Sequence, residues 1–187
     1  MRVNIIFFCI ILAITGCQNR KQKMLGHWNQ LGVLPTVEGF NKADSVIFND
    51  TTFEWHYVVF QDIEKQHKIF TLRMNGTWVC EGRNEKDPEL TNFKLQVKEK
   101  YITLFDSVPK AMDNYYLRIC YLPLNTEVDI STTGCAVMAP IKEQPAIYQC
   151  CMVNDGKLSI GKYNLHEQPD APEKRPTDIE KLVFVKK

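Results

Sequence analysis

The sequence predicts an all-β protein, either an antiparallel up-and-down barrel or an open barrel or sandwich, with about eight to ten strands. From residue 45 onward, the chain consists of short apolar or alternating segments that turn residues separate. Helical periodicity is almost absent from this part of the chain. Because no repeat and no second domain boundary is visible, residues 24–187 are predicted to form one β-barrel-like domain.

The expected strands have the lengths and the turn-bounded ends that are typical of antiparallel sheets. Phe93, Leu95 and Val97 alternate with polar residues, which indicates a strand with one face in water. In chain order, the expected strands cover residues 45–48, 53–59, 68–74, 77–81, 93–97, 101–105, 115–122, 146–153, 157–163 and 182–185.

Three turn sequences set the expected connections between these strands. Asn75-Gly76 is the preferred pair for a type I′ turn, in which both central residues need a positive φ, so it predicts a tight hairpin. Asn154-Asp155-Gly156 predicts a second hairpin, and Glu99-Lys100 predicts a further tight turn.

The first sixteen residues have the pattern of a cleaved export signal. Arg2 precedes an apolar run from Ile5 to Ile14. This run is too short to cross the hydrocarbon core of a bilayer, which is about 30 Å thick and needs about twenty residues. Residues 1–16 are therefore predicted to be a signal peptide rather than a membrane-spanning helix.

The end of this run, Ile14-Thr15-Gly16-Cys17, resembles the lipobox of bacterial lipoproteins. The resemblance implies that Cys17 is acylated, that the acyl chains bind the membrane, and that residues 17–23 are a lipidated polar tether. Gln18-Asn19-Arg20-Lys21 is basic, whereas signals for surface display are usually acidic at this place. We therefore expect a lipid-anchored protein of the bacterial cell envelope, on the outer membrane and facing the periplasm. A plain signal peptide with an incidental cysteine is the alternative.

The charge balance limits the classes of partner. Arg2 is the one charged residue within residues 1–16, so cleavage reduces 23 basic side chains to 22, against 22 acidic ones. The mature chain is formally neutral and has no excess of positive charge for a phosphate backbone, so no nucleic-acid partner is expected. Membrane attachment is expected from the acyl chains, which in combination bind a bilayer stably.

The cysteines beyond Cys17 enter a compartment that permits disulfides. Cys120 and Cys135 flank a long connection that a bridge would restrain, so this pair is predicted to be bonded. A bond from one of these two to Cys150 or Cys151 is the alternative.

The other cysteines are expected in strands. Cys150 and Cys151 are adjacent in an expected strand, so their side chains should point to opposite faces and not bond to each other. Cys80 shares a strand face with Trp78 and is expected to be a free, buried thiol.

Three motifs follow one another in the first part of the domain: Gly26-His27-Trp28, the sequence from Phe48 to Phe53, and Asn75-Gly76-Thr77-Trp78. Their order resembles that of lipocalin-like barrels, including small lipoproteins of the Bacteroidetes. Gly26-His27-Trp28 resembles the Gly-x-Trp opening of lipocalins, in which the Trp closes one end of the barrel. The resemblance covers about residues 24 to 105. It implies a lipocalin-like barrel for this part of the chain.

A candidate ligand site lies on the expected strand 53–59. Phe53, Trp55 and Tyr57 share one face of this strand, and an aromatic face inside a barrel suits an apolar ligand cavity. Tyr116 and Arg118 on a later expected strand would supply polar contacts. Plain core packing, or stacking on sugars or on a partner protein, are the alternatives for the aromatic face.

No motif of a known catalytic site is present, and the four histidines are spread singly along the chain. The protein is therefore predicted to be non-enzymatic and to use no cofactor or metal. The first hypothesis is an envelope-anchored lipoprotein that binds a small apolar ligand. The alternative is an envelope interaction or inhibitor protein of the lysozyme- or protease-inhibitor type.

Overall fold

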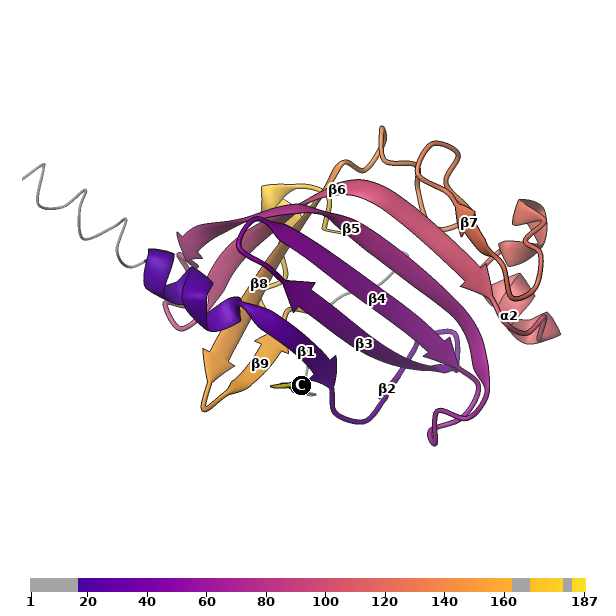
Figure 1. Cartoon of the computed structure of the whole chain (residues 1–187), viewed down its shortest axis with the longest axis horizontal. Helices are drawn as coiled ribbons and strands as arrows, with labels where there is room; N and C mark the ends of the chain where they lie inside the picture. The colour runs from indigo at the N-terminus through magenta and orange to yellow at the C-terminus, as the bar shows by residue number, and fades with distance from the viewer. Residues whose placement is uncertain (1–16, 163–168, 180–182) are drawn as a thin grey trace, which may run out of the picture.

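The computed structural model of the chain describes residues 17–162, 169–179 and 183–187. In this part of the chain, eight of the ten strands close into an antiparallel barrel, in the order β1-β3-β4-β5-β6-β8-β9-β10 and back to β1 (Figure 1). β2 extends the sheet beside β3, and β7 pairs with β6 outside the closed ring. The predicted all-β barrel is thus confirmed.

The elements of the described residues lie in the following order: β1 (Gly26–Gln30), β2 (Leu34–Pro35), β3 (Asn41–Phe48), β4 (Thr52–Phe60), β5 (Lys68–Arg83), β6 (Thr91–Leu104), α2 (Pro109–Asn114), η1 (Leu117–Cys120), β7 (Glu127–Asp129), β8 (Ala146–Asn154), β9 (Lys157–Ile160), η2 (Pro172–Lys174) and β10 (Phe184–Lys186).

Alternating side chains of the long strands fill the barrel. Along β4, the residues Phe53, Trp55, Tyr57 and Val59 all point inward and are buried, as the sequence predicts. Trp28 on β1 is fully buried, and its Nε1 donates a hydrogen bond of 2.7 Å to the carbonyl oxygen of Met24. Because each strand has one inward apolar face, closure of the sheet buries a single continuous core.

The Asn75-Gly76 hairpin prediction is wrong. β5 runs without a turn from Lys68 to Arg83 and pairs with β6 along most of its length. Asn75 lies opposite Glu99 and Gly76 lies opposite Val97, so Lys98 is an extra residue on β6. The Asn-Gly pair therefore faces a β-bulge rather than forming a turn.

The same bulge explains why the turn predicted at Glu99-Lys100 is also wrong. β6 continues through these residues to Leu104, and the inward positions change from odd to even numbers across the bulge. A Cβ atom on Gly76 would lie only 2.0 Å from the carbonyl oxygen of Gln96. The close approach of the two backbones at this point therefore requires glycine.

Other predicted connections are confirmed. β3 and β4, which contain the expected strands 45–48 and 53–59, pair with each other, and β8 and β9 form the expected hairpin. Asp155 and Gly156 at its tip have φ values of 50° and 71°, which is the conformation that a type I′ turn needs. The closing strand is present as β10, whereas residue 163 of the expected strand 157–163 and residue 182 of the last strand lie outside the described residues.

The strand predicted over residues 115–122 is wrong. α2 ends at Asn114, and residues 117–120 form the 3₁₀ helix η1. The physical reason is the lack of a free edge, since Tyr101–Thr103 of β6 already pair with β7. Tyr115 instead packs edge-on against Phe70, with ring centroids 5.0 Å apart, and α2 covers that end of the core.

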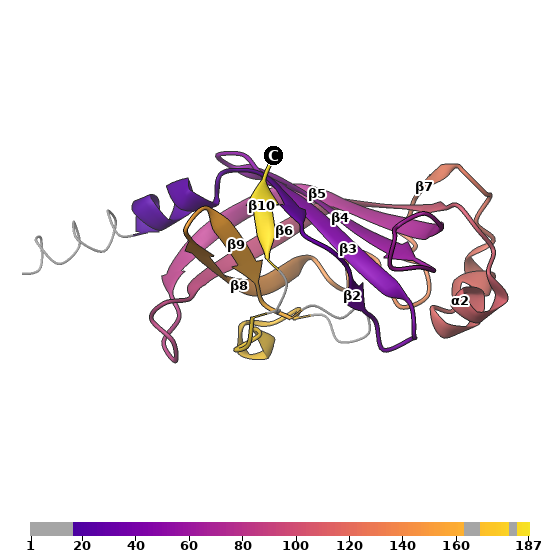
Figure 2. The same ribbon diagram turned by 90° about the horizontal axis from the view of Figure 1, so that it is seen from below.

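The two ends of the molecule carry different helical segments. Residues 17–24, which include the predicted tether, are helical and lie at one end of the long axis (Figure 1). α2 and β7 lie at the opposite end, as the perpendicular view in Figure 2 also shows. Among the described residues, no helix has the length and hydrophobicity that a membrane crossing requires.

Candidate functional site

Trp55 and Tyr57, two of the predicted ligand residues, lie inside the barrel. Both side chains are buried, with exposed fractions of 1% and 3%. They face the interior beside inward residues of β3, since Trp55 is paired with Val46 and Tyr57 with Asp44. This arrangement makes the aromatic face of β4 part of the packed core.

A buried ion pair that the sequence analysis missed lies next to Tyr57. Lys42 and Asp44 point inward from β3, and Lys42 Nζ lies 3.6 Å from Asp44 Oδ2 and 5.5 Å from the centre of the Tyr57 ring. Gln30 Oε1 accepts a hydrogen bond of 3.2 Å from the Asp44 amide. The expected strand began at residue 45, whereas β3 begins at Asn41, so Lys42 and Asp44 were not placed on the inward face with Val46.

Tyr116 and Arg118, the other two predicted ligand residues, do not lie on this interior face. They flank and form part of η1 on the outside of the barrel, where Tyr116 is 60% exposed. Arg118 forms an exposed salt bridge with Asp113 at the end of α2, which lowers the pKa of Asp113. The structure therefore does not bring the four predicted residues together.

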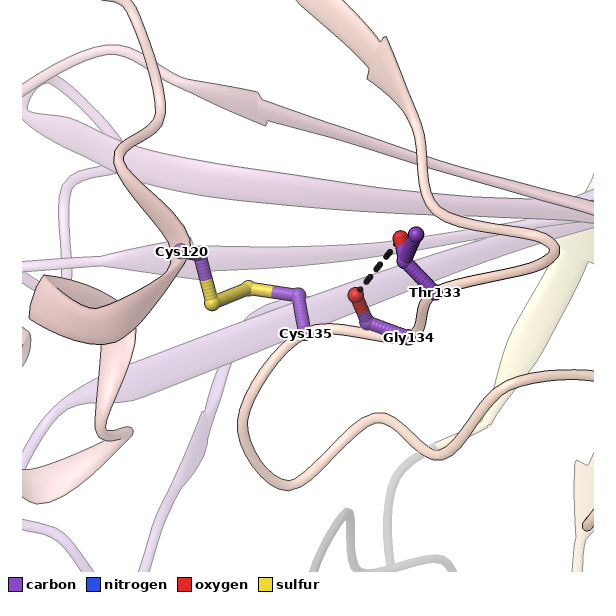
Figure 3. The surroundings of a disulfide bond; sticks show 4 residues. All are labelled: Cys120, Thr133, Gly134 and Cys135. Atoms are coloured by element: carbon purple, nitrogen blue, oxygen red, sulfur yellow. Dashed lines mark hydrogen bonds between the residues drawn. A yellow bond between two sulfur atoms is a disulfide. The ribbon is translucent and has the colours of Figure 1, made fainter.

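These outer residues belong to a long excursion between β6 and β8, which we name the stapled segment (residues 106–144). The predicted disulfide between Cys120 and Cys135 is present, with 5.6 Å between the Cα atoms (Figure 3). Next to it, Thr133 Oγ1 donates a hydrogen bond of 3.1 Å to the Gly134 carbonyl oxygen. The bridge ties η1 to the loop that follows β7, so two distant parts of the segment are held together.

The remaining cysteines of the described residues are free thiols. Cys80, Cys150 and Cys151 are buried, so the alternative bridges to Cys150 or Cys151 are absent. Burial raises the pKa of Cys80 and of Cys150 to about 11, so both thiols stay protonated near neutral pH. Protonated, buried thiols are poor nucleophiles and poor metal ligands.

The backbone of the stapled segment is strained at four positions. Tyr116, Tyr121, Asn125 and Ala136 have φ values of 50° to 56°, in the left-handed region. For tyrosine and alanine, this conformation costs on the order of 1 kcal/mol or more and persists only where the surroundings enforce it. Such strain is concentrated at functional sites.

Large apolar side chains project from this strained backbone into solvent. Tyr116, Ile119, Tyr121 and Leu124 are each at least half exposed, and Tyr121 is exposed by 92%. A groove of about 560 Å³ lies beside Ile119 and the disulfide. Its lining comprises Ile119, Cys120, Leu122, Val128, Ile130, Thr133, Gly134, Cys135, Ala136, Val137, Met138, Ala139, Pro140 and Glu143.

A buried lysine attaches the stapled segment to the barrel. Lys100 Nζ donates hydrogen bonds to the Ala139 carbonyl oxygen at 2.9 Å and to Gln144 Oε1 at 3.1 Å. The Lys100 amide also donates to Ser131 Oγ at 2.9 Å. Because both acceptors of the ammonium group are neutral, burial lowers the pKa of Lys100 from 10.5 to about 8.

This lysine should make folding stability rise with pH. Below pH 8, the folded and unfolded states both hold the proton, and the folded state has the full cost of burying the charge. Above pH 8, the folded state loses the proton while the unfolded chain keeps it up to its pKa of 10.5. The unfolding free energy should therefore increase by about 1.4 kcal/mol between pH 7 and pH 9.

Urea unfolding at several pH values measures this contribution. In a Lys100→Met variant, the increase between pH 7 and pH 9 should disappear, whereas a Lys98→Met variant, changed at an exposed position of the same strand, should retain it. If the unfolding free energy changed with pH identically in the wild type and in Lys100→Met, Lys100 would not be the source of the increase.

The stapled segment differs in charge from the rest of the chain. It contains three basic side chains (Lys110, Arg118 and Lys142) and five acidic ones (Asp106, Asp113, Glu127, Asp129 and Glu143). The chain as a whole has a formal net charge of +1, so this segment is acidic and the remainder is basic. Among the described residues, no three His, Cys, Asp or Glu side chains converge in a way that could hold a metal ion.

The chain matches no protein-family model and no curated protein sequence.

Proposed function

We propose that the protein is a non-enzymatic, lipid-anchored protein of the bacterial cell envelope that binds another protein through the stapled segment. The observation that carries the proposal is the set of four large apolar side chains that a disulfide-bonded, strained backbone presents to solvent. Contiguous exposed apolar surface on a small protein is typical of an interaction site.

Rigidity and residue type both support a protein partner. Tyrosine offers a large, amphipathic contact surface at a low entropic cost, and a disulfide reduces the cost of ordering the loop on binding. The exposed segment contains Tyr116 and Tyr121 on either side of η1. Because the segment is acidic, the partner is expected to present a basic surface with an apolar cleft.

The proposed anchor is acylated Cys17, on the outer membrane and facing the periplasm. The support for it is the sequence around Cys17 and the position of the helical residues 17–24 at the end of the molecule opposite to the stapled segment (Figure 1). An envelope inhibitor of lysozyme or of a protease fits this description, since it needs a rigid exposed surface and no internal cavity.

Site-specific photo-crosslinking in cells tests the proposed surface. A photoreactive phenylalanine analogue at Tyr121 or at Ile119 should form an adduct with a specific envelope protein. The same analogue at Ile63, which is 66% exposed but lies in the β4–β5 connection, should form none. With the identified partner, or with purified lysozyme or protease, the double variant Ile119→Ser, Tyr121→Ser should bind at least about tenfold more weakly.

Two results would count against this proposal. Equal adduct formation from position 63 and position 121 would mean that the stapled segment has no special role. Quenching of tryptophan fluorescence by palmitate, haem or a sterol, without any protein adduct, would favour the alternative of a small apolar ligand beside Trp55 and Tyr57.

A further inference from the structure

The helix of residues 17–24 is fastened to the barrel by an arginine. Arg20 Nη1 donates hydrogen bonds to Thr91 Oγ1 at 2.9 Å and to the Leu90 carbonyl oxygen at 3.3 Å. Its Nη2 donates to the Pro88 carbonyl oxygen at 3.1 Å. Two carbonyl oxygens of the β5–β6 connection and the hydroxyl oxygen of the first residue of β6 thus hold one guanidinium group, which has a fixed planar geometry.

Contacts on either side of Arg20 fix the rest of the helix. Lys21 Nζ lies 2.7 Å from Asp50 Oδ1 and 5.9 Å from the centre of the Trp78 ring. At the end of the helix, Met24 is fully buried, and its carbonyl oxygen accepts the Trp28 hydrogen bond described above. The predicted tether is therefore part of the folded domain in this structure.

Cys17 itself lies against the barrel. Its Sγ donates a hydrogen bond of 3.1 Å to the Cys80 carbonyl oxygen. Acylation replaces the S–H bond with a thioether, so this one bond is absent from a lipidated chain. The contacts of Arg20, Lys21 and Met24 involve other atoms, so a lipidated chain can still make them.

We infer that the protein stands end-on on its membrane, with the barrel end near Thr91 against the bilayer and the stapled segment pointing away from it. This inference rests on the proposed lipid anchor at Cys17. A flexible tether of seven residues could reach about 24 Å and would let the domain rotate freely. An eight-residue helix is only about 12 Å long, and here Arg20, Lys21 and Met24 fasten it to the barrel.

The barrel then sets the distance between the membrane and the interaction surface. β5 has 16 residues, and a strand of this length spans about 50 Å. The stapled segment lies at the far end of the long axis in both perpendicular views (Figures 1 and 2). The partner that the geometry fits is therefore a protein free in the periplasm or attached to the cell wall, not one embedded beside the anchor.

The basic residues after Cys17 hold the domain in this orientation. Arg20 and Lys21 do so through their contacts with the barrel. Lys23, on the same helix, is exposed. Lys23→Ala is therefore a matched control, since it removes a positive charge near the membrane without removing a contact of Arg20 or Lys21.

Energy transfer on vesicles tests the orientation. The acylated protein is reconstituted in phosphatidylglycerol–phosphatidylethanolamine vesicles that contain a rhodamine lipid, with a donor dye on Asn154→Cys or on Ile119→Cys. Asn154 shares a surface depression with Arg20 and Lys23, whereas Ile119 belongs to the stapled segment. The ratio of the transfer efficiency from position 154 to that from position 119 should be at least three. The double variant Arg20→Ala, Lys21→Ala should reduce this ratio toward one, and Lys23→Ala should not change it.

A second measurement separates this inference from the proposed anchor. In the non-acylated Cys17→Ser chain, amide hydrogen exchange of residues 20–24 should be at least tenfold faster with Arg20→Ala than without it, and Lys23→Ala should have no effect. Equal transfer from positions 154 and 119 in the wild type, or no change in exchange with Arg20→Ala, would overturn the end-on arrangement. Membrane retention of the Cys17→Ser chain after a carbonate wash would instead overturn the anchor at Cys17.

Discussion

Gly76→Ala should destabilise the barrel by about 3 kcal/mol or more, the upper part of the range for steric overpacking. The added methyl group would lie 2.0 Å from the carbonyl oxygen of Gln96, which belongs to the backbone of β6. A backbone oxygen within a ladder cannot move aside as a flexible side chain can. The two longest strands would therefore have to separate at the bulge.

Urea unfolding measures this loss, and Gly82→Ala is the control. Gly82 lies on the same strand and has open space around its Cα atom, but its φ is +99°. Alanine there should cost about 1 to 2 kcal/mol from backbone strain alone. If the two variants lost the same stability, the close approach at Gly76 would not be the constraint that we infer.

Removal of the Cys120–Cys135 bridge should cost about 3 kcal/mol of unfolding free energy. The two cysteines are separated by 15 residues, and closing a loop of this length lowers the entropy of the unfolded chain by about that amount. The double variant Cys120→Ser, Cys135→Ser measures it without leaving an unpaired thiol. Because the segment is strained at Tyr121 and Ala136, we also expect its amides to exchange faster than those of β4 and β5.

Cys150, which is a free thiol, provides the matched control for the Cys120–Cys135 bridge. Cys150 is buried, and its Sγ donates to the Pro176 carbonyl oxygen at 3.0 Å, a bond that a serine hydroxyl can replace. Cys150→Ser should therefore cost less than about 1 kcal/mol. A reducing agent should lower the stability of the wild type to that of the double variant. If the oxidised wild type and the double variant unfolded at the same urea concentration, the bridge would contribute nothing.

The sequence identified most strands because their alternation is a local property. It failed at Asn75-Gly76 because turn propensity is also local, whereas the pairing of β5 with β6 is not. The unbroken series of inward positions through Leu72, Met74 and Trp78 could have indicated one long strand. On β6, the change of parity between Val97 and Lys100 is the sequence mark of a bulge.

The candidate site was harder to predict for a different reason. The Cys120–Cys135 pairing followed from loop length, but the position of Tyr116 and Arg118 depended on whether β6 had a free edge. That edge is occupied by β7, a strand of three residues that has too short a pattern to identify. Lys100 could not be recognised as a buried attachment point because its acceptors, Ala139 and Gln144, are about forty residues away.

The short strands on one side of the barrel determine how it closes. β9 and β10 have only four and three residues. β10 pairs with β1, with Lys186 opposite Trp28 and Phe184 opposite Gln30, so this ladder joins the two ends of the chain. This ladder has the greatest sequence separation in the sheet, so its loop-closure entropy makes it the last to form during folding. It should also be the first to open in sub-global fluctuations. We therefore expect the barrel to open at the seam between β1 and β10, while the pairing of the long strands stays intact.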